Sequence, residues 1–135
     1  MNRYVITGFI LCSLYFISCF AQEWVRINPS FDPPGIYNMS LGTFVDEKNG
    51  WFVEQFPGRI FHTTDGGENW HQQKDSSDVW CYDIVCTDTL YGCIVGEKIL
   101  DRTHFLWQTK NGGDSWKEVS IPDTMEGPFC ITFFD

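Results

Sequence analysis

Two stretches of the sequence, TTDGGENW at residues 63–70 and TKNGGDSW at residues 109–116, follow one pattern and decide the fold. Each begins with threonine, has aspartate or asparagine at the third position, continues with two glycines and ends in tryptophan. The stretches lie 46 residues apart, a spacing typical of proteins built from repeated supersecondary units. The chain is therefore best understood as copies of one small unit.

A second pair of matching stretches extends the repeat beyond this motif. DEKNGW at residues 46–51 corresponds to DTLYGC at residues 88–93, with an offset of 42. The difference of four residues places an insertion around residues 101–105. Tryptophans at 24, 70 and 116 keep the 46-residue period, and FFD at 133–135 resembles FVD at 44–46. The repeat therefore covers nearly all of the chain after its first 21 residues.

Each unit is expected to form four short strands separated by turns. Aromatic and β-branched residues fill the expected strands, while Gly, Asp, Asn and Pro mark the joints, and no long helical stripe is visible. A four-stranded antiparallel unit of this period is a β-propeller blade, so the sequence predicts an all-β fold. The expected strands are 38–45, 50–55, 59–64 and 69–73 in the first unit, and 79–86, 91–96, 104–109 and 115–119 in the second.

The residue types of the motif are those that fold a tight hairpin. Asp65 can accept backbone N–H bonds within its own turn, and Asn111 can replace it because asparagine also tolerates the left-handed region. The glycines supply positive φ angles, and each tryptophan ring can bury about 150–250 Å². We therefore expect a structural role for the motif residues, which are Thr63, Asp65, Gly67, Trp70, Thr109, Asn111, Gly113, Ser115 and Trp116.

The two motifs resemble the Asp-box, or bacterial neuraminidase repeat, written S/T-x-D-x-G-x-S/T-W. They depart from it at Asn69, which replaces a hydroxyl residue, and at Asn111, which replaces the aspartate. Together with GWFV at 50–53 and GRIF at 58–61, the first motif looks like a blade of the photosystem II stability/assembly factor family. Sialidase and sortilin-type blades are more distant relatives. The resemblance implies a propeller with the box on the blade rim, protein partners and no cofactor.

The first 21 residues have the features of a secretory signal. A short positive start at Arg3 precedes a charge-free apolar run, and small residues before the expected cleavage after Ala21 suit a signal peptidase. An alternative is a bacterial lipoprotein box at residues 16–19, in which Cys19 would carry the lipid. The chain is therefore expected to be exported, either periplasmic, at the cell surface or secreted.

The remaining residues, 22–135, are expected to form a partial propeller of about two and a half blades. Propellers commonly have four to eight blades. Uncovered blade edges would favour self-association. The expected parts are an outer strand of a closing blade at 24–28, blades at 36–74 and 78–120, and the start of a further blade at 128–135.

Charge and ligand spacing exclude several classes of function. The formal charge of the full chain is −9, and removal of the signal, whose only charged side chain is Arg3, makes it −10. This balance disfavours binding to nucleic acids and anionic lipids. The chain has no Cys-x-x-Cys pair, and His62, His71 and His104 are scattered, so no metal site is expected. No integral membrane span is expected either.

Four cysteines follow the signal, at 81, 86, 93 and 130. Cys86 and Cys93 are symmetric about the turn at 88–91, so the sequence allows a disulfide between them across a hairpin, as export permits. The alternatives are two small buried thiols, or a strand register that separates the two side chains.

The leading hypothesis for function is an exported, non-catalytic propeller module for protein–protein interaction or assembly. The alternative is a fragment of a secreted sialidase-like glycoside hydrolase. That enzyme would need a cluster of arginines, a Tyr/Glu nucleophile pair and an acid. Only Arg26, Arg59 and Arg102 follow the signal, and Arg26 is out of phase with the other two. We therefore expect no catalytic residues.

Overall fold

The computed structural model describes residues 28–35, 37–38, 41–121 and 130–132, and this part of the chain is all-β, with nine strands in two sheets and no helix. The first sheet contains β1 (Ser30–Asp32), β2 (Leu41–Phe44), β3 (Gly50–Val53), β4 (Ile60–Thr63) and β5 (Asn69–Lys74). The second contains β6 (Val79–Cys86), β7 (Gly92–Lys98), β8 (His104–Thr109) and β9 (Lys117–Val119).

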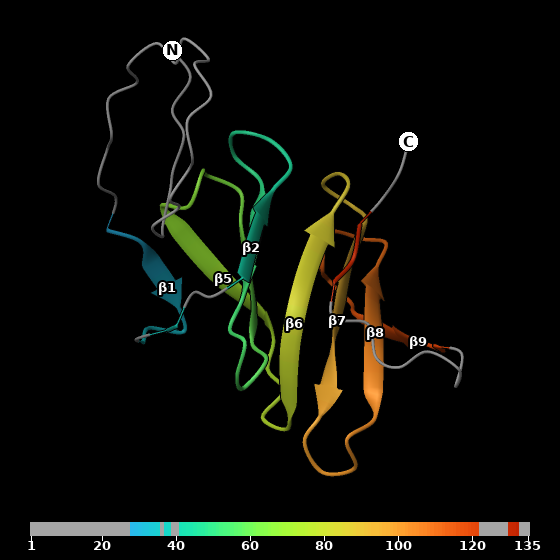
Figure 1. Ribbon diagram of the computed structural model, residues 1–135. Coiled ribbons are helices and arrows are strands. Elements are labelled where there is room, and N and C mark those ends of the chain that lie inside the picture. The colour runs from blue at the N-terminus through green and yellow to red at the C-terminus, as the bar shows by residue number, and fades with distance from the viewer. Residues whose placement is uncertain (1–27, 36, 39–40, 122–129, 133–135) are drawn as a thin grey trace, which may run out of the picture.

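Strands β2 to β5 and strands β6 to β9 each form an antiparallel meander, in which consecutive strands pair with each other. The spatial orders are β1-β5-β4-β3-β2 and β6-β7-β8-β9. The innermost strands, β2 and β6, lie side by side where the two sheets meet (Figure 1). The expected all-β fold of four-stranded blades is confirmed. The fifth strand, β1, was not expected, and it pairs with β5 in parallel.

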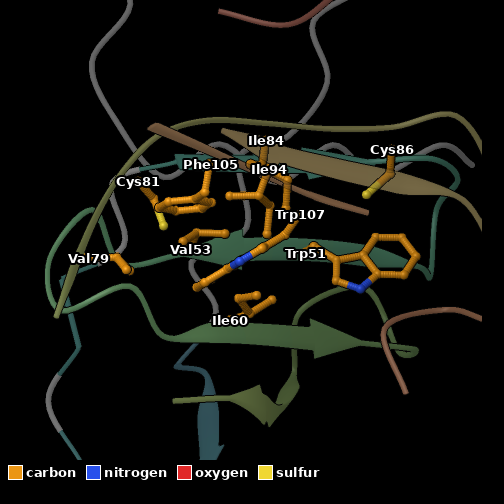
Figure 2. Packing of buried hydrophobic residues seen from close by; sticks show 10 residues of the cluster. All are labelled: Trp51, Val53, Ile60, Val79, Cys81, Ile84, Cys86, Ile94, Phe105 and Trp107. Carbon is orange, nitrogen blue, oxygen red and sulfur yellow. The ribbon is translucent and has the colours of Figure 1, made fainter. Parts of the chain in front are cut away.

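One hydrophobic core lies between the sheets and joins them (Figure 2). Side chains alternate between the two faces of a strand, so every second residue of each sheet points into this core. Burial of this apolar area supplies the main energy that holds blade to blade, at about 25 cal/mol per Å². The buried members are Trp51, Val53, Ile60, Val79, Cys81, Ile84, Cys86, Ile94, Phe105 and Trp107.

A second core covers the opposite face of the first sheet. Phe52, Phe61 and Trp70 point to that face and are buried there. Phe31 and Tyr37 pack over them from the N-terminal side. Strand β3 is therefore buried on both faces, which explains why all four residues of GWFV are inaccessible.

The connections gather at two opposite ends of the sheets (Figure 1). The turns at 45–49 and 87–91 lie at one end together with the two glycine-rich motifs, and we call this the box end. The connections at 54–59, 75–78 and 99–103 lie at the other, which we call the loop end. Any ligand that reaches the loop end therefore meets connections from both sheets.

Gly96 of β7 gives a test of the packing. A Cβ at this position would collide with the Trp80 carbonyl oxygen and the Phe105 ring. We expect Gly96→Ala to lower the free energy of unfolding by about 1–3 kcal/mol, as overpacking does, measured by urea denaturation. Gly42→Ala is the control, because the closest atom to a Cβ there is the Trp51 carbonyl oxygen at 3.3 Å. Equal losses in the two variants would contradict this account.

Candidate functional site

The first motif is closed by hydrogen bonds among its own residues. The Thr63 hydroxyl donates to Asp65 Oδ1 at 2.8 Å and accepts from the Gly67 amide at 3.0 Å. The Asn69 amide donates to Asp65 Oδ1 at 2.9 Å. The Trp70 indole N–H donates to the Gly67 carbonyl at 3.0 Å. Each side chain of the pattern therefore holds the turn itself.

The second motif repeats this geometry with asparagine in place of aspartate. The Thr109 hydroxyl donates to Asn111 Oδ1 at 3.0 Å and accepts from the Gly113 amide at 2.8 Å. The Ser115 amide donates to Asn111 Oδ1 at 3.1 Å. Trp116 is half-buried and packs against the core between the sheets.

Both motifs are also tied to the neighbouring turn of their own sheet. The Gly66 amide donates to the Lys48 carbonyl at 2.9 Å, and the Gly112 amide donates to the Leu90 carbonyl at 3.0 Å. Gly66 has a φ of 76° and Gly112 a φ of 69°, in the region that favours glycine. The motif residues thus build the box end of the sheets and are not arranged as a reaction centre.

A glutamine that the sequence analysis did not single out joins the two sheets at the box end. Gln73 of β5 accepts from the Trp51 indole N–H at 3.1 Å and donates to the Gly112 carbonyl at 2.7 Å. The ammonium of the adjacent Lys74 lies 4.6 Å from the centre of the Trp107 ring. Polar contacts therefore supplement the apolar core across the junction of the sheets.

The loop end carries two buried glutamates, each paired with an arginine five residues later. Glu54 Oε2 lies 3.4 Å from Arg59 Nη1, and Glu97 Oε1 pairs with Arg102 Nε. The repeated spacing, Glu-x4-Arg at 54–59 and at 97–102, is visible in the sequence and was missed there. A buried carboxylate is costly without such a partner.

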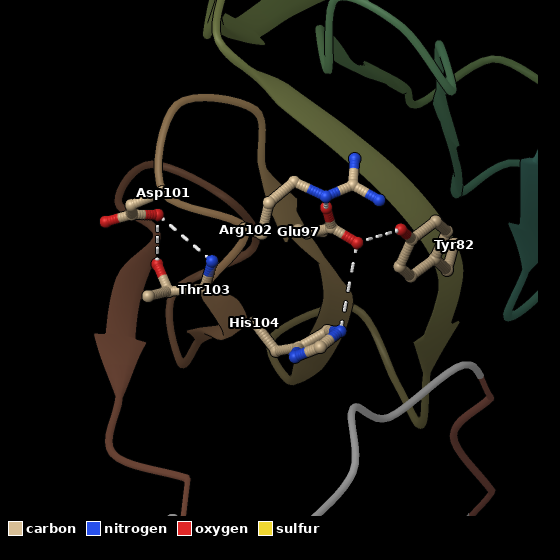
Figure 3. A network of polar contacts seen from close by, with 6 residues as sticks. All are labelled: Tyr82, Glu97, Asp101, Arg102, Thr103 and His104. Atoms are coloured by element: carbon tan, nitrogen blue, oxygen red, sulfur yellow. Dashed lines mark hydrogen bonds and ion pairs between the residues drawn. The ribbon is translucent and has the colours of Figure 1, made fainter.

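The Glu97 carboxylate is held from several sides (Figure 3). The Tyr82 hydroxyl donates to Oε2 at 2.7 Å, which raises the pKa of Tyr82. His104 Nε2 lies 3.9 Å from the same oxygen. Arg102 has a φ of 60°, the only positive φ outside glycine among the described residues. This strained loop residue keeps an exposed guanidinium over a buried acid.

The Glu54 carboxylate, like that of Glu97, is held by several neighbouring groups. Its Oε1 accepts from the Asn38 amide at 2.8 Å. The Arg59 guanidinium lies 3.9 Å from Asp75 and 5.4 Å from the centre of the Tyr37 ring. Arg59 and Arg102 are thus each engaged by carboxylates of this chain, whereas Arg26 lies outside the described residues.

An exposed aromatic pair bridges the two sheets at the loop end. Phe56, from the connection between β3 and β4, stacks on Trp80 of β6 with ring centres 5.1 Å apart and planes at 24°. The two residues remain 47% and 40% exposed. The Cys81 amide donates to the Gln55 carbonyl at 2.8 Å, which ties the loop to β6 beside the pair. The pair is therefore fixed in place and accessible.

The hairpin disulfide that the sequence allows is not formed, because the strand register separates the two side chains, which is one of the alternatives that the sequence left open. Cys86 is the partner of Gly92, and Cys93 is the partner of Val85, so the two side chains leave opposite faces of the sheet. All four described cysteines are free thiols. Cys86 packs into the core between the sheets, where burial raises its pKa to about 12. Cys93 Sγ accepts from Gln108 Nε2 at 3.9 Å.

His62 and His71 are partners on the neighbouring strands β4 and β5, whereas His104 lies apart in the second sheet. His62 stacks on Trp51 with ring centres 4.2 Å apart, and burial lowers its pKa. His71 lies on the exposed side of β5, and His104 lies at the loop end. Within the described ranges, no three His, Cys, Asp or Glu side chains are grouped as metal ligands. No helix in the same ranges is long and apolar enough to cross a membrane.

Comparison with known proteins supports the fold. No protein-family model matches the chain, and no curated protein matches it. A solved structure described as "YCF48 bound to D1 peptide" is similar, with a TM-score of 0.56 and 23% sequence identity. The match covers 76% of this chain and 30% of that one, so this chain spans less than a third of its neighbour. The fold of this chain is that of β-propeller blades.

The two motifs differ in a way that pH should reveal. Desolvation acts to raise the pKa of Asp65, but hydrogen bonds from Asn69, Thr63 and the Glu68 amide outweigh it and lower that pKa to about 2. The carboxylate therefore stabilises the fold above pH 3.8, and this contribution is lost as the pH falls from about 3.8 towards about 2. We expect the Tm of Asp65→Asn to decrease less over this pH range than the Tm of the wild type.

The reciprocal variant is the matched control for that measurement. Asn111→Asp places a carboxylate in the same turn of the second sheet, so its Tm should fall more steeply with acid than that of the wild type. Parallel pH profiles for all three proteins would show that the Asp65 carboxylate contributes nothing specific.

Thiol labelling tests the strand register. In the folded chain without reductant, we expect iodoacetamide to modify the exposed Cys130 and to spare Cys81, Cys86 and Cys93, which are buried. Denaturation without reductant should then make all three reactive, as counted by intact mass. If Cys86 and Cys93 became reactive only after reduction, the two residues would be joined by a disulfide and the observed register would be wrong.

Proposed function

We propose that the chain is an exported, non-catalytic β-propeller module that binds a protein partner. The observation that carries this proposal is the exposed pair of Phe56 and Trp80 at the loop end. Aromatic side chains are enriched where proteins bind one another, because they bury a large area at a small cost in conformational entropy. A pair contributed by two sheets, and fixed by the bond from Cys81 to Gln55, is preorganised for such contact.

The surroundings of the pair favour a binding role over glycoside hydrolysis. The sialidase-type alternative requires arginines that are available to bind a substrate carboxylate. Arg59 and Arg102 instead neutralise Glu54 and Glu97 of the chain itself. Both carboxylates therefore stabilise the loop end, where the aromatic pair and Leu100 are exposed apolar side chains.

The neighbour's printed description supports the same proposal, because that structure holds YCF48 with a peptide. We extend peptide or protein binding to this chain as part of the proposal. The formal charge of −9 disfavours nucleic acids and anionic lipids as partners. Export through a signal at residues 1–21, or a lipid anchor at Cys19, belongs to the proposal as well, since both lie outside the described residues.

A selection from a random peptide library displayed on phage tests the proposed function. The wild-type chain should enrich peptides that bind with a measurable Kd. The double variant Phe56→Ser/Trp80→Ser should weaken the binding of those peptides at least about tenfold, since loss of a central aromatic anchor costs 2 kcal/mol or more. Fluorescence anisotropy with the enriched peptides measures the change.

The matched control removes two exposed apolar side chains from the box end. Leu90 and Tyr91 are 52% and 47% exposed, so Leu90→Ser/Tyr91→Ser changes a similar area away from the aromatic pair. This control should bind the enriched peptides like the wild type. Equal binding by all three proteins would reject the aromatic pair as the site, and the absence of enriched peptides would reject the proposed function.

A further inference from the structure

The segment at residues 30–35 and 37, which we call the strap, lies on the first sheet as a bound peptide would. Its strand β1 pairs in parallel with the outer edge of β5, with Phe31 beside Trp70 and Asp32 beside His71. The Ser30 amide donates to the Glu68 carbonyl at 2.8 Å. All other strand pairings in the described residues are antiparallel, so β1 is an addition to a completed four-stranded meander.

Two aromatic side chains attach the strap to a socket in the sheet. The socket consists of Phe52, Phe61 and Trp70, the buried residues of the second core. Phe31 contacts Phe52 and Phe61 edge to face, with ring centres 5.9 Å apart in both pairs. Tyr37 lies 4.6 Å from Phe61, measured between ring centres. The socket residues belong to β3, β4 and β5, so the socket is built without the strap.

The remaining contacts of the strap are weak. Asp32 Oδ2 lies 3.8 Å from His71 Nδ1, but these side chains are 78% and 65% exposed. An ion pair in water contributes little. The Tyr37 hydroxyl donates to the Pro33 carbonyl at 2.8 Å, a bond within the strap that adds nothing to its attachment. The strap is therefore attached mainly by three paired residues and two rings, and the Arg59 guanidinium also lies 5.4 Å from the centre of the Tyr37 ring.

We infer that the outer edge of β5 and the socket form a groove for an extended segment of a partner protein, which the strap occupies as an internal ligand. Strand addition provides backbone hydrogen bonds, and the socket selects an aromatic side chain. His71 lies beside the next position, which the strap fills with Asp32, so an acidic residue is compatible there. The partner segment is thus an extended strand with an aromatic residue, followed by a position that accepts an acidic one. This inference rests on the proposed function and names a second contact surface for it.

Competition between the strap and a separate peptide provides the test. The probe is a fluorescein-labelled peptide with the sequence of residues 30–38, SFDPPGIYN. In the wild-type chain the strap competes at an effective concentration of the order of millimolar. Phe31→Ser in the full chain should release the strap, so that the probe binds this variant at least about tenfold more tightly than the wild type. A probe that carries the same substitution should lose binding to both.

Two further variants make the result interpretable. Leu90→Ser removes an exposed apolar side chain from the turn at 87–91, away from the aromatic pair, and should bind the probe like the wild type. If Phe31→Ser does not unfold cooperatively, Phe31→Leu keeps apolar volume in the socket and should show a smaller increase in the same direction. Equal probe affinity for the wild type and the variants, or equal affinity of the two probes, would overturn the inference.

The same experiment separates the groove from the proposed function and from self-association. Suppose that the enriched library peptides need Phe56 and Trp80, but that Phe31→Ser does not bind the probe more tightly than the wild type. This result would reject the groove and leave the proposed function standing. Suppose instead that sedimentation velocity shows a wild-type dimer that the probe dissociates. This result would assign the groove to a second copy of this chain and would overturn its assignment to a segment of a partner protein.

Discussion

The junction between the two sheets is the constraint on which the other features depend. Trp51, Val53 and Ile60 from one sheet meet Val79, Ile94 and Phe105 from the other because side chains alternate along each strand. A shift of one residue in the register of any of these strands would turn its core side chains towards the opposite face. The hydrogen bonds of Gln73 to Trp51 and Gly112 fix the same junction at the box end, so packing and polar contacts specify one arrangement.

In that arrangement, the residues at the two ends of the sheets have different roles. At the box end, Asp65 and Asn111 use their oxygens on backbone amides of their own turns, and these residues are therefore structural. At the loop end, Glu54 and Glu97 stabilise connections that also carry Phe56 and the start of β6. The connections around the aromatic pair are thus supported by two buried glutamates, each paired with an arginine.

The sequence predicted the all-β fold and eight of the strands because turn chemistry recurs at a fixed period and is local. It did not predict β1, since three residues that add in parallel to an edge have no periodic signal. The sequence left the register at Cys86 and Cys93 open. A pairing symmetric about the turn at 88–91 would place the two cysteines opposite each other, whereas the structure pairs Cys86 with Gly92. The aromatic pair could not be predicted, because Phe56 and Trp80 meet only through the tertiary junction.

Differences between the two repeats therefore carry more information about function than their similarities. Trp51 stacks on His62 in the first sheet, whereas the corresponding Cys93 meets Gln108 in the second. The same strand frame accepts either pair, so its folding does not require the aromatic stack in both copies. Equally, only the first sheet carries a fifth strand among the described residues. Selection for folding alone would preserve the shared turns and the alternating core, and features confined to one repeat are where a specific partner can be recognised.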